Sequence, residues 1–301
     1  MTECRLSLVV VAYNMGRELP RTIHSLSPAM QRGVDAGDYE IIIVDNGSTQ
    51  PFDEASCRRA VPGLRIEYMP DPTPSPVAAI NRGLELARGD LVGVWIDGAR
   101  LASPGLLETA LMAARMHPRA VIGTIGFHLG PDVQMKSVHE GYDQAREDAL
   151  LASVDWEADA YRLFGISSFA GSSANGWFMP IAESNALFMR RALWDELGGY
   201  EPAFRMAGGG LANLDIWRRA CEAPGTRVII LLGEGTFHQV HGGVATNAER
   251  PMFPLFHEEY RRIRGQPFRA PDVDALFVGR VPEAALEKLA WSARRAMEPR
   301  S

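Results

Sequence analysis

The sequence predicts an α/β protein whose core is a doubly wound, mostly parallel β-sheet. Aliphatic runs carry this prediction, because strands buried on both faces of a parallel sheet are hydrophobic almost throughout. They lie at residues 6–13, 40–45 and 90–97, with a shorter run at 64–69. Helical patterns separate them, at residues 16–30, 53–60 and 76–89. This alternation of strand and helix is typical of right-handed βαβ crossovers.

The pattern is less regular beyond residue 100. We expect helices at 104–116, 190–197 and 211–221, and strands at 120–127 and 226–232. The residues between 130 and 180 are irregular and rich in glycine, serine and aromatic side chains. From about residue 246 the chain turns to proline, arginine and glutamate and ends in an amphipathic helix. We therefore expect three parts: residues 1–100, residues 101–245 and a C-terminal helical extension at 246–301, which offers a surface for a homodimer.

The composition is that of a globular protein. Of 301 residues, 46% are hydrophobic and 23% are charged, and the net charge is −6, which argues against a surface specialised for nucleic acid. The three cysteines are far apart and odd in number, so reduced thiols are expected rather than disulfides. No apolar run approaches the roughly 18 residues of a membrane span. These features predict a soluble, cytoplasmic protein.

The three long aliphatic runs all end in polar residues. Tyr13 and Asn14 close the first run, Asp45 closes the second and Asp97 closes the third. In a parallel sheet the carboxyl ends of the strands border the ligand crevice. We therefore expect these side chains to converge on one ligand, although a simple Asx-turn would also explain Asp45.

Several motifs follow one another in an order that resembles family 2 glycosyltransferases. They read "VVVAYN", "IIIVDNGST", "NRGLELARGDLVGVWID", "ESNALFMRRALWDELGGYEPAF" and "LDIWRRA", and they span about residues 5–245. The resemblance implies the GT-A fold. It also implies transfer of a sugar, with inversion, from a nucleotide-sugar donor that is UDP-linked to a hydroxyl of a glycan or other acceptor. Residues 1–100 would bind the donor, and residues 101–245 would bind the acceptor and catalyse the transfer.

The resemblance places the nucleotide at the first three strand ends. Asp45 can accept a hydrogen bond from uracil N3–H, and Tyr13 offers a flat face for stacking; the alternatives are an Asx-turn and a core tyrosine. Asn81 resembles a position that lies along the ribose and diphosphate, with simple helix packing as its alternative. The implied nucleotide-binding residues are Ala12, Tyr13, Asn14, Asp45, Asn81, Ile96 and Asp97.

The metal motif departs from the family pattern. In "WIDGARL", Asp97 keeps the first carboxylate of a D-x-D motif, whereas Ala99 replaces the second. Either Mg²⁺ or Mn²⁺ is held by Asp97, the diphosphate and a distant histidine, or Arg100 takes over part of the neutralisation. His238 and His241 are the candidate histidines. In an extended chain they would point to opposite faces, so we expect only His238 to bind the ion.

The position expected for the catalytic base also departs from the family pattern. The family carries an acidic pair just before a D-x-x-x-R helix segment, which here is Asp215–Arg219, but the paired positions read Ala212 and Asn213. Asparagine cannot accept a proton as a base. Asp215 is the nearest carboxylate. Glu183 is the other candidate, at a position beside the acceptor cleft where the family usually has a small residue.

Two further residues are candidates for the acceptor side. Trp177 lies in a glycine- and serine-rich loop, where it could form a platform under a sugar ring or belong to the core, and His241 could also contact the acceptor. The departures at Ala99 and Asn213 leave two alternatives open. The chain could be a nucleotide- or glycan-binding protein that has lost catalysis, or a transferase that needs no metal.

Overall fold

The computed structural model describes residues 5–242 and 252–298. Its strands are β1 (Leu6–Ala12), β2 (Tyr39–Asp45), β3 (Arg65–Tyr68), β4 (Leu91–Trp95), β5 (Arg100–Ala102), β6 (Ala120–Leu129), β7 (Ser167–Phe169), β8 (Ala186–Arg190), β9 (Arg227–His238) and β10 (Ala275–Gly279). Within the described residues they form one 10-stranded sheet in the order β10-β9-β6-β8-β4-β1-β2-β3, with β5 paired to β9 and β7 to β6. Most neighbours are parallel, so the predicted α/β fold with a mostly parallel sheet is confirmed.

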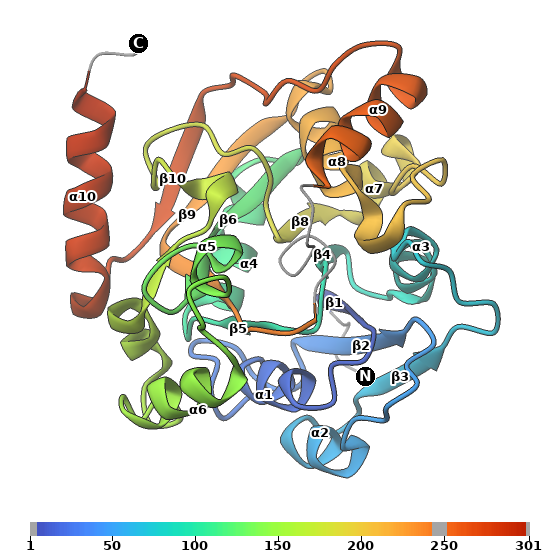
Figure 1. Ribbon diagram of the computed structural model, residues 1–301. Helices are drawn as coiled ribbons and strands as arrows, with labels where there is room; N and C mark the ends of the chain where they lie inside the picture. Colours follow the sequence, from blue (N-terminus) through green and yellow to red (C-terminus); the bar gives the residue numbers. More distant parts are fainter. Residues whose placement is uncertain (1–4, 243–251, 299–301) are drawn as a thin grey trace.

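Helices cover both faces of this sheet (Figure 1). They are α1 (Glu18–Ser25), α2 (Glu54–Ala60), α3 (Val77–Leu86), α4 (Leu106–Met116), α5 (Gln134–Ser137), α6 (Gln144–Ala152), α7 (Arg191–Leu197), α8 (Ala212–Glu222), α9 (Phe253–Arg264) and α10 (Leu286–Met297). The predicted helix at 16–30 is shorter than expected. It ends at Ser25, because Pro28 lacks an N–H and restricts the residue before it.

Alternate residues of the central strands enter two separate cores. Val9 and Val11 of β1 face the core beneath α3, α7, α8 and α9, whereas Leu8 and Val10 face the core beneath α1, α2 and α4. The period of two follows from the pleat of a strand, and burial on both faces explains the unbroken aliphatic runs. Gly83 lets α3 approach closely, because an added Cβ there would lie 2.2 Å from a Val9 methyl group.

Four strands were not predicted: the three-residue strands β5 and β7, and the longer strands β8 and β10. β8 runs antiparallel between β4 and β6 and joins the two halves of the molecule into one sheet. β10 belongs to the predicted helical extension, yet it pairs with β9 in parallel and closes one end of the sheet. The extension does contain the helices α9 and α10, and Figure 1 shows α10 at the end of the molecule beyond β10. The part of the chain after residue 246 is therefore partly an edge of the main sheet.

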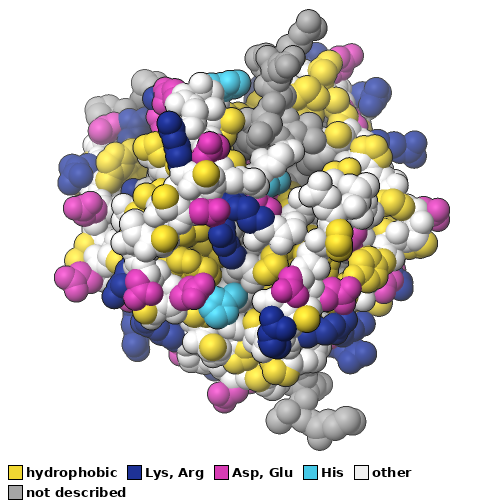
Figure 2. Space-filling model, turned by 60° about the horizontal axis from the view of Figure 1, so that its bottom comes forward, with side chains coloured by type: hydrophobic (Ala, Val, Ile, Leu, Met, Phe, Trp, Pro, Cys, Tyr) yellow, Lys and Arg dark blue, Asp and Glu magenta, His cyan; other side chains and the backbone are white. Residues whose placement is uncertain are grey.

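Surface and interior agree with a globular chain. On the face shown in Figure 2, acidic and basic side chains are interspersed, and no broad area of one charge is visible. No helix among residues 5–242 and 252–298 is both long enough and apolar enough to cross a membrane. Cys57 and Cys221 are buried free thiols, as predicted, whereas Cys4 lies outside the described residues.

A buried carboxylate on β9, that of Glu234, links this strand to two segments distant in the sequence. Glu234 is 2% exposed, and it accepts hydrogen bonds from the Ser103 hydroxyl at 2.5 Å and from the Tyr161 hydroxyl at 2.8 Å. Burial raises the pKa of Glu234 to about 7, although these donors act in the opposite direction. Glu234 therefore takes up a proton in the folded state at pH values where the unfolded chain would have lost it.

This pKa predicts a pH-dependent stability. A carboxyl group whose pKa is raised on folding stabilises fully below its unfolded pKa, near 4.5, and this contribution is lost as the pH rises through about 7. Glu234→Gln, which mimics the protonated acid, should leave the free energy of unfolding nearly unchanged at pH 4.5. At pH 8 it should raise that free energy by about 2 kcal/mol relative to wild type. Urea unfolding of both proteins at the two pH values measures these free energies. An equal effect of the substitution at pH 4.5 and pH 8 would contradict the raised pKa of Glu234.

Candidate active site

The predicted nucleotide-binding residues lie level with one another at the carboxyl ends of three parallel strands. In the register of β1 with β2, Ala12 stands opposite Asp45. In the register of β1 with β4, Val10 stands opposite Trp95, so Asp97 follows at the level of Ala12. Tyr13 comes directly after β1 and is 53% exposed, which leaves its ring open to a ligand rather than in the core. The strand ends thus converge as the sequence predicts.

Asp45 is part of a tightly ordered loop. One of its carboxylate oxygens, Oδ1, accepts hydrogen bonds from the backbone N–H of Gly47 at 2.9 Å and of Ser48 at 2.7 Å, which is the Asx-turn considered above. Asn14 closes the loop from β1, because its Oδ1 accepts from the N–H of Thr49 at 2.8 Å. None of the described residues donates a hydrogen bond to the other oxygen of Asp45, Oδ2. The turn therefore orients the Asp45 carboxylate through Oδ1 alone and leaves Oδ2 available as a hydrogen-bond acceptor.

Asn81 has a different position from the one predicted. Its side-chain amide forms two hydrogen bonds with the backbone of Tyr200, one from Nδ2 to the carbonyl at 2.8 Å and one from the N–H to Oδ1 at 2.9 Å. This clasp fastens α3 to the segment after α7, and it occupies both ends of the amide. These bonds do not support a contact between Asn81 and the ribose or diphosphate. They support the alternative that Asn81 packs α3 against its neighbour.

Three potential metal ligands gather at the ends of β4 and β9. Asp97, His238 and His241 each offer one ligand atom, and these atoms lie within 4.8 Å of one another. The two Nε2 atoms are 3.1 Å apart, and His238 Nε2 is 3.8 Å from an oxygen of Asp97. Two nitrogens bound at about 2.1 Å to one cation would be separated by roughly 3 to 4 Å, so the arrangement fits a divalent cation.

The expectation that only one histidine faces the site was wrong. It assumed an extended chain, but β9 ends at His238, and the chain turns so that His241 returns to the same side. The peptide of Val240 is held in this turn from outside. Its N–H donates to Glu147 at 2.7 Å, and its carbonyl accepts from Arg17 at 3.3 Å. The ion pair between Glu147 of α6 and Arg17, the residue just before α1, thus positions the second histidine.

A glutamine fixes which nitrogen of His238 faces the site. Gln134 Nε2 donates to the carbonyl of His238 at 2.9 Å, so Gln134 Oε1 is the atom that lies 2.5 Å from His238 Nδ1. Nδ1 must then carry the proton, and Nε2 keeps the lone pair that a metal requires. No sequence pattern pointed to Gln134, which lies in the irregular region 104 positions before His238.

The histidines are neutral in this environment. Burial, with the positive charge of Arg100 acting in the same direction, lowers the pKa of His238 well below its usual range. Burial also lowers the pKa of His241, and it lowers that of the neighbouring His128 to about 4. Arg100 is itself paired with Asp97, its Nε donating to Oδ2 at 2.8 Å. Neutral imidazoles beside a carboxylate form a suitable donor set for a divalent cation.

Glu183 lies just before β8, next to the end of β4. Residues 183–185 continue β8 alongside the end of β4, and the Ile96 N–H donates to the Asn185 carbonyl at 3.3 Å. The Glu183 carboxylate accepts a hydrogen bond from Asn213 Nδ2 at 2.7 Å. Asn213 is held in turn by the hydroxyl of Tyr200, which donates to Oδ1 at 3.0 Å. Two buried side chains, Asn213 and Tyr200, therefore set the orientation of the Glu183 carboxylate.

The structure argues against Asp215 as the catalytic base. Asp215 is 1% exposed, and its oxygens accept hydrogen bonds from Arg219 at 2.8 Å and from Arg264 at 2.7 Å. With two guanidinium groups on one carboxylate, no oxygen is left to take a proton from an acceptor. Asp215 instead ties α8 to α9.

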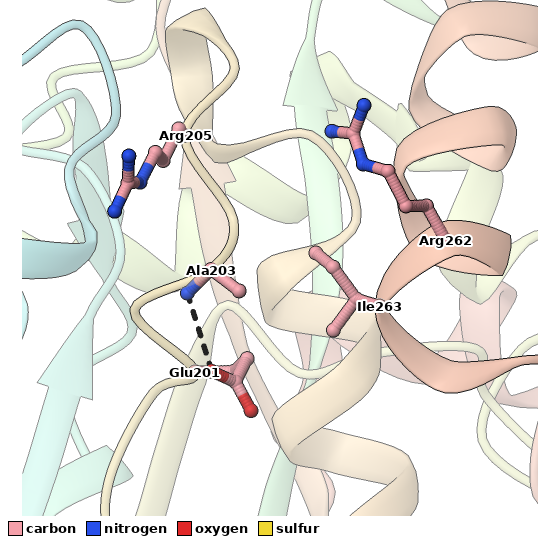
Figure 3. Close-up of a pocket in the computed structure, with 5 residues that line it drawn as sticks. All are labelled: Glu201, Ala203, Arg205, Arg262 and Ile263. Carbon is pink, nitrogen blue, oxygen red and sulfur yellow. Dashed lines mark hydrogen bonds between the residues drawn. The ribbon is translucent and has the colours of Figure 1, made fainter.

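A surface pocket of about 460 Å³ lies next to this ion cluster, where Arg264 also pairs with Glu201 at 3.2 Å. Figure 3 shows Arg205, from the loop before α8, and Arg262, from α9, on different sides of it. None of the residues predicted for the site lines this pocket, so it is not the crevice at the strand ends.

Trp177 belongs to the core. It is 0% exposed, its Nε1 donates to the carbonyl of Leu231 at 3.0 Å, and its ring packs on Phe127 and Phe169. The prediction that it forms a platform for a sugar was wrong, because a side chain enclosed on all sides cannot meet a ligand. Its neighbour Phe178 is only partly buried and packs edge-on against Phe277 of β10.

The fold is that of a GT-A-type α/β protein, and sequence comparison assigns the family. The sequence model of the family described as Glycosyl transferase family 2 matches residues 7–196. The chain therefore belongs to glycosyl transferase family 2 and is a glycosyltransferase. No curated protein sequence is significantly similar to it.

Solved structures with the same fold include S. aureus TarS. Residues 1–349 of TarS match with a TM-score of 0.53 at 15% identity, over 87% of this chain and 74% of that one. The TarS complex with UDP matches with a TM-score of 0.51 at 16% identity, over 86% and 70% of the two chains. The complex with UDP-GlcNAc gives 0.52 at 16% identity, over 86% and 65%. At such low identity the likeness concerns the fold.

The environment of Asp215 predicts a stability defect rather than a catalytic one. Asp215→Asn removes the charge that two arginines share, and should lower the free energy of unfolding by about 2 to 4 kcal/mol. Turnover per folded molecule should stay close to that of wild type. Urea unfolding and initial rates measure the two effects. Glu222→Gln is the control on the same helix: it breaks an exposed pair with Arg218 and should cost about 0.5 kcal/mol or less. Loss of turnover without loss of stability would restore Asp215 as the base.

Proposed function

We propose that this glycosyltransferase moves a sugar from a UDP-linked donor to a hydroxyl of a glycan or other acceptor, with inversion at the anomeric carbon. One observation carries the proposal. The residues suited to the base, the diphosphate and the acceptor hydroxyl, namely Asp45, Asp97 and Glu183, lie at one edge of the sheet, where β1, β2 and β4 end and β8 begins. The solved TarS complexes with UDP and UDP-GlcNAc support the choice of nucleotide, since they share this fold.

A divalent cation held by Asp97, His238 and His241 belongs to this proposal. Two imidazoles and one carboxylate suit Mn²⁺ better than Mg²⁺, which prefers oxygen ligands in octahedral geometry. Such a cation supplies positive charge against the diphosphate as it leaves. Gln134 would hold His238 in the required tautomer, and the Glu147–Arg17 pair would hold the turn that carries His241.

The protein's own part in the transfer is to position the two substrates and to take a proton. The acceptor oxygen forms a bond to the anomeric carbon from the face opposite the donor diphosphate. The bond from that carbon to the diphosphate oxygen breaks, and its electron pair leaves with the UDP. Glu183 takes the proton of the acceptor hydroxyl. A single displacement of this kind inverts the anomeric centre.

The contact between Glu183 and Asn213 supports Glu183 as the base. Asn213 stands at a position where the resemblance implies an acid, and Glu183 stands where it implies a small residue. The two side chains are hydrogen-bonded at 2.7 Å. The carboxylate that Asn213 lacks is therefore supplied by Glu183, the residue in contact with it. Burial raises the pKa of Tyr200, so its hydroxyl remains a donor and keeps Asn213 oriented toward Glu183.

The donor and metal assignments predict metal-dependent nucleotide binding. UDP should bind about 10-fold or more tightly in Mn²⁺ than in EDTA, because the cation offsets the diphosphate charge. His241→Gln should abolish most of this difference, whereas His139→Gln, at an exposed histidine, should not. Titration calorimetry measures both. Equal affinity for UDP in Mn²⁺ and in EDTA would favour a transferase that needs no metal. If UDP did not bind under either condition, the proposal of a UDP-linked donor would be refuted.

The base assignment predicts a loss of turnover with binding intact. Glu183→Gln should lower kcat by about 10²- to 10⁴-fold, because the amide takes no proton, while the affinity for UDP changes little. Initial rates of UDP release with a UDP-sugar and acceptor measure kcat.

The neighbouring asparagine supplies the matched control. Adding Asn213→Asp to Glu183→Gln returns a carboxylate to the contact and should recover part of the rate. A Glu183→Gln enzyme with wild-type kcat would rule out this base.

A further inference from the structure

Arg100 lies where the donor diphosphate would bind. It stands opposite His238 in the antiparallel pairing of β5 with β9, and residues directly opposite in such a pair project from the same face. Arg100 is 8% exposed. Its guanidinium is therefore enclosed beside the same carboxylate and histidine that form the candidate metal centre.

The guanidinium is only partly satisfied there. Nε donates to Asp97 Oδ2 at 2.8 Å, whereas Nη1 is buried and meets no hydrogen-bond acceptor among the described residues. A buried N–H of a charged group without an acceptor is costly, and native proteins seldom leave one so. The geometry thus calls for one more acceptor at this side of Arg100, and a strong anion would serve best.

The charges around Arg100 favour a phosphate. Asp97 carries one negative charge, which Arg100 balances through their ion pair. These protein groups therefore offer a diphosphate no net repulsion, even before a cation binds. A planar guanidinium also matches phosphate oxygens in geometry and stays charged at every physiological pH.

We propose that Arg100 is a second, permanent cation of the leaving-group site, whose Nη groups donate hydrogen bonds to the donor diphosphate. This inference rests on the proposed function and deepens it, because it assigns a further catalytic residue. When the bond from the anomeric carbon to the diphosphate oxygen breaks, the electron pair adds negative charge to the phosphates that Arg100 contacts. A fixed positive charge there stabilises the transition state more than the bound donor. Arg100 acts together with the divalent cation and does not replace it.

The test compares nucleotides with and without phosphates. Arg100→Met should lower the affinity for UDP in EDTA by about 10-fold or more, because charge-assisted hydrogen bonds to phosphate are lost. Its affinity for uridine should equal that of wild type, since uridine carries no phosphate. Its affinity for Mn²⁺ should be equal or higher, because a neighbouring positive charge is gone. Arg115→Met removes one exposed arginine at the end of α4, far from the strand ends, and should change none of the three.

Other outcomes separate the alternatives. If Arg100 only orients Asp97, then Arg100→Met weakens Mn²⁺ binding and leaves UDP binding in EDTA unchanged, which overturns the inference. If wild-type protein binds uridine and UDP equally in EDTA, the inference fails while the base site stands. If it binds neither under any condition, the proposed function itself fails. Should Arg100→Met not fold, Arg100→Lys keeps the charge but loses the planar fork, and should show a smaller loss for UDP with uridine unchanged.

Discussion

The register between β1 and its two parallel neighbours is the constraint on which the site depends. Because Ala12 stands level with Asp45 on one side and Asp97 on the other, two carboxylates from distant parts of the sequence come to the same edge of the sheet. A slip of one residue would turn every side chain of β1 to the other face, so the two cores on either side of the sheet fix the register strongly. Other site residues join at the same level, Glu183 from the strand beside β4 and His238 from the end of β9.

Much of the first half could be predicted from the sequence, and the reason is local. Strands buried on both faces must be aliphatic throughout, and their polar ends mark the crevice, so composition along the chain nearly determines the architecture. β8 and β10 escaped prediction because each has only five residues and lies within a segment with other signals. β10 also depends on a partner strand, β9, that lies far from it in the sequence.

The sequence identified several candidate residues of the site, but it could not show which side chains contact one another. Asp97 and His238 were identified from the strand ends and the resemblance to the family's motifs. The return of His241 depends instead on a turn held by Glu147 of α6 and by Arg17, which precedes α1. Asp215 and Glu183 looked equivalent along the chain. Only the fold shows that two arginines saturate the first, while the second meets a single amide. Trp177 was misjudged because a glycine-rich loop signals exposure, yet this loop crosses the aromatic core.

The antiparallel strand β8 has a mechanical consequence. It is hydrogen-bonded to β4 on one side and contacts β6 on the other, so the parts of the chain before and after residue 100 share one continuous sheet. The two parts therefore cannot swing apart about a hinge, since that would break the ladder at its centre. The end of β4, which Asp97 follows, and the start of β8, which Glu183 precedes, are therefore tied together by a hydrogen-bonded ladder. Any closing over substrates is left to the loops that follow the strands.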